Sequence, residues 1–209
     1  MKNYVITIAR GFGSGGREVG FKLSEKLGIP CYWSQILSMA SDYSGISRSL
    51  FEQSDEKFRQ QDILRKLKVA KNTDKIVEPS DKDFTSDVNL FNIQKKIICE
   101  LAKSESCIII GKCSNHILRN YDNVVSVYIE APRKACVARL KDYLGVNDDE
   151  AAAMIHQTDK YRADYYRYYT GGDYWTNPTS YHMTLNSDRI GIENCAELII
   201  SYLKISGKM

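Results

Sequence analysis

The sequence predicts an α/β domain in which helices cover both faces of a mostly parallel sheet. Segments rich in apolar and β-branched residues alternate along the chain with segments of helical periodicity, as in repeated strand–helix–strand units. The N-terminal strand leads through a glycine-rich loop into a helix, an arrangement found at the ligand-binding edge of such sheets. The 209 residues are 43% hydrophobic and 26% charged, which suits one domain with a sizeable core.

The first segment of the chain carries the clearest local signals. Residues 4–9 are mostly apolar and rich in β-branched side chains, which is typical of a strand buried on both faces. Val19, Leu23 and Leu27 then recur at helical spacing. Gly28, followed by isoleucine and proline, ends this helix.

A helical and loop insertion is expected around residues 44–87. A helix at residues 34–43 precedes it, and residues 47–69 predict a long polar helix with scattered apolar anchors. Residues 71–87 are polar and predict a loop. The helix at 47–69 is long enough to pair with a second copy of the chain, so a homodimer stays open as an alternative.

The C-terminal half returns to a regular alternation of strands and helices. A long helix is expected around residues 148–172, capped by an Asn or Asp at 147–148 and ended by Gly171-Gly172. In the last helix, Leu198 and Ile199 are expected to face the core. The remaining expected elements are helices at 88–103, after Pro132 and at 192–203, a short strand at 30–33, and strands at 107–110, 124–129 and 181–185.

Composition and charge argue against several classes of protein. A net charge of +3 without a concentrated basic face gives no case for nucleic-acid binding. The six cysteines include no CxxC pair and most lie in apolar segments, so we expect free thiols in a reducing compartment rather than disulfides or a zinc site. No apolar stretch reaches membrane-spanning length and no signal-peptide pattern precedes the first strand, so we expect a cytoplasmic protein without a membrane partner.

The loop between the first strand and the first helix predicts a phosphate site. Small residues let the backbone wrap around an anion, and the N-terminus of the next helix adds unpaired N–H groups and the positive end of its dipole. Arg17 adds a forked cation that suits phosphate oxygens. The alternative is a tight turn that binds no ligand. The predicted phosphate-binding residues are Gly11, Gly13, Ser14, Gly15, Gly16 and Arg17.

This loop matches two nucleotide-binding motifs only in part. It fits GxGxxG, but residues 31–39 contain no Asp or Glu to bind a ribose, so a dinucleotide cofactor ranks low. Against the P-loop motif GxxxxGK[ST], aligning residues 13–15 with the loop glycines puts Gly16 at the lysine position, and Arg17 and Glu18 follow it. The usual lysine and the magnesium-binding hydroxyl are therefore both absent.

Four segments together resemble the cytidylate kinase-like family, relatives of the P-loop nucleoside monophosphate kinases. They are IARGFGSGGREVG at residues 8–20 and the segments 108–113, 159–166 and 185–193, in order over nearly the whole chain. The resemblance implies a single three-layer α/β/α P-loop kinase-like domain over residues 1–209, with a five-stranded, mostly parallel sheet and a lid-like helix around 148–172. It also implies phosphoryl transfer from ATP, with Mg²⁺, to a nucleoside monophosphate, with CMP or dCMP as the default acceptor.

The resemblance also suggests roles for the basic residues. Lys160 and Arg167 share one face of the expected lid helix, where a salt-bridged surface is the plain alternative. Phosphoryl transfer spreads negative charge over the migrating group, and cations on a closing lid stabilise that charge. The candidates are therefore Arg17, Lys160, Arg162 and Arg167 for catalysis, Lys112 and Arg139 for binding the acceptor, and Ser14 for contacting Mg²⁺.

The missing lysine and hydroxyl leave a second hypothesis open. In it, the chain is a catalytically degenerate protein that binds a nucleotide or another phosphorylated metabolite and acts as a sensor or regulator. Thermal stabilisation by nucleotides without turnover would separate this hypothesis from a phosphotransferase.

Overall fold

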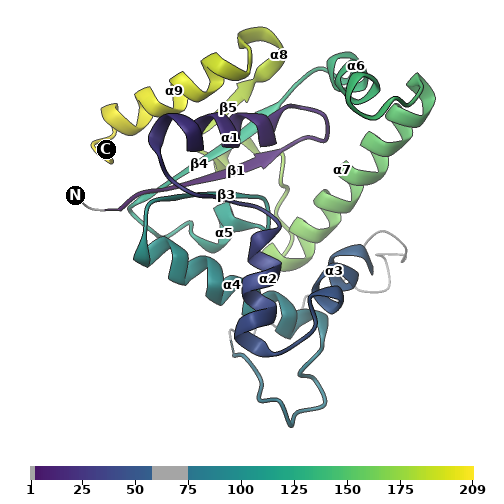
Figure 1. Cartoon of the computed structure of the whole chain (residues 1–209), viewed down its shortest axis with the longest axis vertical. Coiled ribbons are helices and arrows are strands. Elements are labelled where there is room, and N and C mark those ends of the chain that lie inside the picture. The colour runs from purple at the N-terminus through teal and green to yellow at the C-terminus, as the bar shows by residue number, and fades with distance from the viewer. Residues whose placement is uncertain (1–2, 58–74) are drawn as a thin grey trace.

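The computed structural model describes residues 3–57 and 75–209 and shows a parallel five-stranded sheet with helices on both faces (Figure 1). The strands are β1 (Val5–Arg10), β2 (Cys31–Tyr32), β3 (Cys107–Ile110), β4 (Val124–Glu130) and β5 (Met183–Asn186). Their order is β2-β3-β1-β4-β5, and every pairing is parallel. The predicted α/β fold is confirmed, and the loops that follow these strands meet at one edge of the sheet.

The helices form the two outer layers. On one face, α1 (Gly16–Leu27) and α9 (Ile192–Ile205) lie side by side (Figure 1). On the other, α4 (Asp87–Ser104) and α7 (Asp148–Thr170) share one buried cluster with the sheet. Helices α2 (Gln35–Ser44) and α3 (Arg48–Lys57) pack with α4, and α6 (Arg133–Leu144) packs against α7. Two short helices, α5 (Ser114–Ile117) and α8 (Ser187–Ile190), complete the fold of the described residues.

The side chains of β1 alternate between the two layers. Ile6 and Ile8 are fully buried in a cluster with Val19 of α1 and Ile199 of α9. Val5 is buried in the opposite cluster, with residues of α4 and α7. Because successive strand residues point to opposite faces, one strand supplies both cores, as its largely apolar, β-branched sequence predicts.

The long helix α7 begins and ends at the predicted places. The Asn147 side chain accepts a hydrogen bond from the Glu150 N–H at 2.9 Å, and the Glu150 carboxylate accepts one from the Asn147 N–H at 3.0 Å. Gly171 then ends the helix with φ of 78°, in the left-handed region that favours glycine. The helix therefore spans Asp148–Thr170, close to the predicted range 148–172.

Tyr169 anchors α7 in the core. Its ring is 1% exposed and stacks on Phe91 of α4 with centroids 3.8 Å apart, and its hydroxyl donates to the Asp87 carbonyl at 3.1 Å. We expect Tyr169→Ala to lower the free energy of unfolding by about 3 kcal/mol. Tyr169→Phe keeps the stack and should lower it by about 1 kcal/mol. Denaturant unfolding measures both, and equal losses would contradict the dominant role of the ring.

Two expectations for individual segments have different outcomes. Leu198 is 43% exposed whereas Ile199 is fully buried, so the prediction that both face the core is wrong for Leu198. Neighbouring helix residues differ in direction by a large angle, which explains the split. The predicted helix at 47–69 is seen as α3 (Arg48–Lys57), and residues 58–74 lie outside the described residues. A homodimer built on that helix therefore stays a prediction.

Among residues 3–57 and 75–209, no helix combines the length and the hydrophobicity that a membrane span needs.

Candidate functional site

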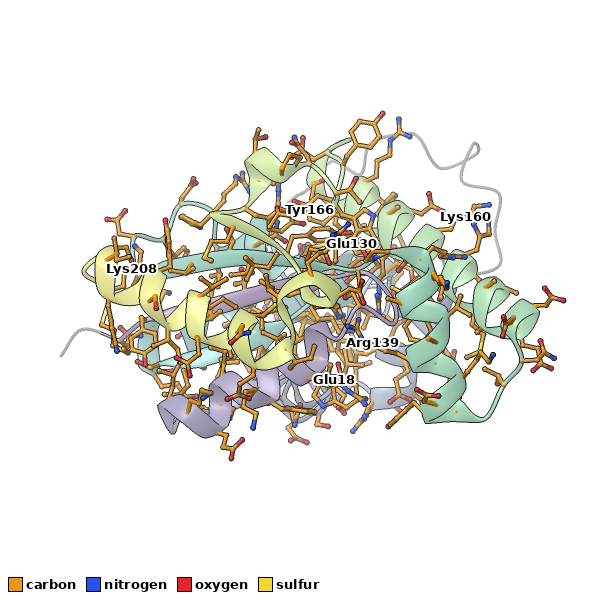
Figure 2. All side chains as sticks on the ribbon, turned by 90° about the horizontal axis from the view of Figure 1, so that it is seen from above. Glu18, Glu130, Arg139, Lys160, Tyr166 and Lys208 are labelled. Carbon is orange, nitrogen blue, oxygen red and sulfur yellow. The ribbon has the colours of Figure 1, made fainter. Side chains whose placement is uncertain are left out.

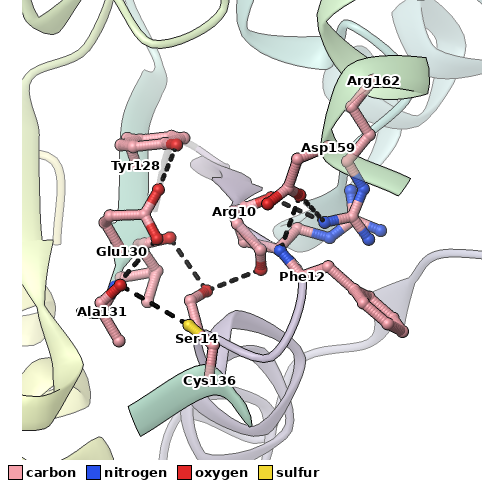
Figure 3. A network of polar contacts seen from close by, with 11 residues as sticks. Arg10, Phe12, Ser14, Tyr128, Glu130, Ala131, Cys136, Asp159 and Arg162 are labelled. Carbon is pink, nitrogen blue, oxygen red and sulfur yellow. Dashed lines mark hydrogen bonds and ion pairs between the residues drawn. The ribbon is translucent and has the colours of Figure 1, made fainter. Parts of the chain in front are cut away.

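Hydrogen bonds beneath the glycine loop fix its conformation. Gly13 and Gly15 have φ of 79° and 80°, in the left-handed region that glycine adopts without strain. Ser14 between them is fully buried, and its hydroxyl donates to the carbonyls of Gly11 at 2.8 Å and Ile129 at 3.0 Å (Figure 3). The hydroxyl thus ties the loop to β4. With its oxygen under the loop, this orientation does not favour the predicted contact of Ser14 with Mg²⁺, which stays a prediction.

The amide groups on the other side of the loop are available to a ligand. Within the described residues, no acceptor takes a hydrogen bond from the backbone N–H of Gly13, Gly15, Gly16, Arg17 or Glu18. The last three belong to the first turn of α1, where the helix dipole adds positive potential. Unpaired amides at a helix N-terminus suit an anion.

A cavity of about 520 Å³, which we call the loop cavity, opens over these amides. Its walls come from the end of β1, the glycine loop, the segment after β2 and the helices α1, α6, α7 and α9. The residues that line it include Gly11, Gly13, Gly15, Gly16, Arg17, Glu18, Arg139, Asp142, Tyr143 and Ile192. It is large enough for a small organic ligand carrying phosphates.

A second cavity of about 250 Å³, which we call the aromatic cavity, lies beyond β3. Its walls carry the rings of Trp33, Tyr161, Tyr165, Tyr166, Trp175 and Tyr181 and the cations Arg10, Lys112 and Arg162. Among the described residues that line it there is no Asp, Glu or His. Flat rings and cations without a carboxylate suit a ligand that has a planar ring and an anionic group.

The backbone at the floor of the aromatic cavity is strained. Gly111, Lys112 and Cys113 have φ of 77°, 57° and 53° in succession. The last two are not glycines, and left-handed backbone at such residues clusters at functional sites. Lys112, a predicted acceptor-binding residue, lies just beyond the carboxyl end of β3 and lines this cavity.

The two cavities share a border. Arg10, Trp33 and Arg162 line both of them. These residues come from the end of β1, the segment after β2 and helix α7. A ligand group in one cavity and a ligand group in the other would therefore meet beside two guanidinium groups.

Helix α7 is bound to the glycine loop at this border (Figure 3). The Phe12 N–H donates to the Asp159 carboxylate at 2.8 Å, and Arg162 Nη1 donates to the Arg10 carbonyl at 2.9 Å. Arg162 and Asp159 also form an ion pair at 3.4 Å. Burial raises the pKa of Asp159, against the opposing effects of the Phe12 N–H and of Arg162. The loop and the predicted lid are thus coupled through polar contacts.

Arg17 and Arg139 are predicted site residues that line the loop cavity. Arg17 packs its guanidinium on the Trp33 ring, 4.9 Å from the ring centroid, and hydrogen-bonds the Tyr143 hydroxyl at 3.2 Å. Arg139 donates from Nη1 to the Gly13 carbonyl and to the Ser187 hydroxyl, both at 3.2 Å. Arg139 thus lies with the glycine loop and apart from Lys112, because α6 runs beside that loop. This position does not suit the predicted acceptor contact.

The other two predicted catalytic residues lie outside both cavities. Lys160 and Arg167 are exposed and do not line either cavity. Figure 2 shows Lys160 on the outer side of α7, away from Arg139 and Glu18. Arg167 lies 5.6 Å from the centroid of the Tyr174 ring. The structure therefore brings Arg162, but not Lys160 or Arg167, to the border between the cavities.

Sequence reasoning missed two residues of that border, Arg10 and Trp33. Arg10 is the last residue of β1 and directly precedes the loop, so its place at the carboxyl edge was a usable signal. Trp33 follows the very short β2, which gave only a weak strand pattern.

Comparison with known proteins assigns the chain to a family. Residues 5–189 match the family model of the cytidylate kinase-like family. The chain belongs to this family. Family membership makes it a kinase-like protein and implies use of a nucleotide, usually together with Mg²⁺.

Solved structures resemble this cytidylate kinase-like chain over nearly its full length. One is an uncharacterized protein from Eubacterium ventriosum, with 24% identity, a TM-score of 0.69 and coverage of 97% of this chain and 99% of that one. A second is the shikimate kinase from Bacteroides thetaiotaomicron, with 16% identity, a TM-score of 0.49 and coverage of 96% of this chain and 98% of that one. A third is the shikimate kinase from Acinetobacter baumannii in complex with shikimate, with 16% identity, a TM-score of 0.49 and coverage of 99% of this chain and 96% of that one. No curated protein matches the sequence.

A nucleotide-bound Mg²⁺ fits the loop cavity of this cytidylate kinase-like chain. The carboxylates of Glu18 and Asp142 line that cavity, and Mg²⁺ prefers oxygen ligands and retains several waters. In the part of the chain that the structure describes, no group of three His, Cys, Asp or Glu side chains is placed to hold a metal ion. Glu18 and Asp142 are the acidic residues of the loop cavity that would contact such an ion or its waters.

Proposed function

We propose that this protein transfers a phosphoryl group from ATP to a nucleoside monophosphate, with CMP and dCMP as the first acceptors to test. The observation that carries the proposal is the shared border of the two cavities. The loop cavity offers unpaired amides for the donor phosphates, and the aromatic cavity offers rings and cations for an acceptor. The two substrates would meet at Arg162.

The chemistry of the aromatic cavity favours an acceptor that is itself a phosphate. An acceptor hydroxyl must lose a proton during transfer, and a carboxylate or a histidine commonly takes it. The described lining of this cavity has neither. A phosphate monoester is largely ionised at pH 7 and needs no base, while Lys112 supplies a cation for it.

Each part of the site has a role in this reaction. The amides of the loop and of the first turn of α1 bind the donor phosphates, and Arg139 holds the loop in place through the Gly13 carbonyl. Arg162 stabilises charge on the migrating group. The tyrosines of α7 shield the meeting point from water. Mg²⁺, when bound with the nucleotide, neutralises phosphate charge.

A panel of acceptors tests the proposal. The protein is incubated with ATP and Mg²⁺ and, separately, with CMP, dCMP, UMP, AMP, GMP and a set of hydroxyl acceptors. ADP release is followed with a coupled assay, and the product is identified by mass. We expect a diphosphate product from at least one pyrimidine monophosphate. ATP binding without ADP release from any acceptor would contradict the proposal.

The degenerate binding protein remains the second candidate, because Gly16 replaces the lysine and the Ser14 hydroxyl faces away from the cavity. In that case nucleotides raise the Tm but no acceptor is phosphorylated. The same panel, read by thermal shift and by product formation, separates the two candidates.

A further inference from the structure

The cation missing from the glycine loop has a counterpart elsewhere in the motif. GxxxxGK[ST] opens with a glycine and carries its lysine six positions later. When Gly15 is aligned with the second glycine of the motif, Arg10 stands at the first glycine and Gly16 stands at the lysine. Relative to the motif, the positions of a glycine and a cation are therefore exchanged.

Packing explains why the two changes occur together. A Cβ built on Gly16 would overlap the Arg10 Cβ and lie 3.0 Å from the Arg10 Cγ. A side chain at position 16 therefore cannot coexist with the stem of Arg10 in this backbone. The residue that excludes the usual lysine is the residue that carries the replacement charge.

The Arg10 side chain extends from the glycine loop toward the acceptor side. A Cβ built on Gly111, at the end of β3, would lie 3.2 Å from the Arg10 Cζ and would overlap Nη1. The guanidinium group thus lies along the border where Arg10 lines both cavities. This is the place where a group passing from one ligand to the other would be found.

The charge of Arg10 is not matched within the protein. Across the described ranges 3–57 and 75–209, no hydrogen bond or ion pair of its guanidinium is formed. Burial and the neighbouring Arg162 lower the pKa of Arg10, and the nearby Asp159 offsets this only in part. A partly buried cation next to another cation is stabilised by an added anion.

We propose that the Arg10 guanidinium binds the transferring phosphoryl group and acts there as the catalytic cation in place of the P-loop lysine. This inference rests on the proposed function. In the transfer, the bond between the γ-phosphorus and the β,γ-bridging oxygen of ATP breaks, ADP keeps the electron pair, and an acceptor phosphate oxygen forms the new bond to phosphorus. Arg10 neutralises charge and exchanges no proton.

The test compares Arg10→Met with the unaltered protein by calorimetric titration with Mg·ATP and with Mg·ADP, and by rates of ADP formation. Because Arg10 would contact the γ-phosphoryl group, we expect ATP affinity to fall by about 10- to 100-fold, and ADP affinity by less than about 3-fold. Turnover should fall by about 10²- to 10³-fold. Arg10→Lys, which keeps the charge, should recover part of both losses.

Thermal unfolding without ligand separates this role from a structural one. Arg10→Met removes a charge that the folded state disfavours, so the Tm should stay unchanged or rise. The matched control is Arg119→Met, since Arg119 is exposed, bonds the His116 carbonyl at 2.9 Å and lines neither cavity. It should change neither affinity nor turnover.

An unchanged ratio of ATP to ADP affinity in Arg10→Met would overturn the proposal, whatever the Tm. The affinity ratio is measurable even if no acceptor is phosphorylated. Absence of turnover in the unaltered protein would therefore count against the proposed function, while the affinity ratio would still decide the role of Arg10.

Discussion

Arg162→Met is expected to reduce the rate of ADP formation by about 10³-fold, the low end of the effect of an arginine that stabilises a migrating phosphoryl group. The side chain of Arg162 is 18% exposed and lines both cavities. Burial lowers the pKa of Arg162, and the Asp159 carboxylate opposes this effect. An anionic ligand group at the border would therefore pair with a poorly hydrated guanidinium. Steady-state rates with the best acceptor of the panel measure the effect.

Variants on the same helix make this prediction selective. Arg167→Met and Lys160→Met remove exposed cations that line neither cavity, and we expect losses below about 3-fold, as for surface charges in general. Losses equal to that of Arg162→Met would instead support the role that the sequence analysis gave to Lys160 and Arg167, and would mean that α7 moves during the reaction. Circular dichroism and Tm of each variant exclude misfolding as the cause.

The fold could be predicted from the sequence because its signals are local. The apolar run of β1, the glycine that ends α1 and the cap of α7 each depend on residues a few positions apart. The glycine loop was found for the same reason. The strand, the glycines and the first turn of the helix follow one another in the chain, so the sequence could predict a phosphate site there, although it matches the known motifs only in part.

The border between the cavities could not be predicted, because it depends on contacts across the whole chain. The bond between the Phe12 N–H and Asp159 joins residues 147 positions apart, and that between Arg162 and the Arg10 carbonyl joins residues 152 positions apart. Helical periodicity groups Lys160 with Arg167 on one face, but it does not say which face of α7 meets the loop. The packing of Tyr165, Tyr166 and Tyr169 decides that, and it turns Arg162 inward.

The direction of single side chains was likewise hidden from the sequence. Ser14 lies in the middle of a phosphate-binding motif, yet the left-handed backbone on either side of it directs its hydroxyl toward β4. Arg139 was assigned by its helix alone, and the approach of α6 to Gly13 and Ser187 then decided its cavity. In both cases the sequence predicted the element but not the direction of the side chain.

Gly16→Lys alone is expected to lower the free energy of unfolding by about 1–3 kcal/mol, the usual effect of overpacking, although it restores the lysine of the P-loop motif. The new side chain would collide with the Arg10 stem, and Ile129 Cβ at 3.3 Å leaves little room on the other side. The collision should also distort the loop amides, so we expect ATP binding to be lost. Denaturant unfolding and calorimetric titration measure the two effects.

The double variant Arg10→Gly/Gly16→Lys removes that collision and recreates the complete glycine–lysine arrangement of the motif. If the two positions are exchanged parts of one phosphate-binding device, the pair should be coupled, and its turnover should exceed that of Arg10→Gly by about 10-fold or more. Arg10→Ala/Gly16→Lys is the matched control, because alanine retains the Cβ that overlaps a side chain at position 16. It should recover much less activity. Equal recovery of turnover in both double variants would show that the steric contact between positions 10 and 16 does not decide where the loop carries its cation. Recovery only in Arg10→Gly/Gly16→Lys would show that the contact between the Cβ atoms at these two positions decides it.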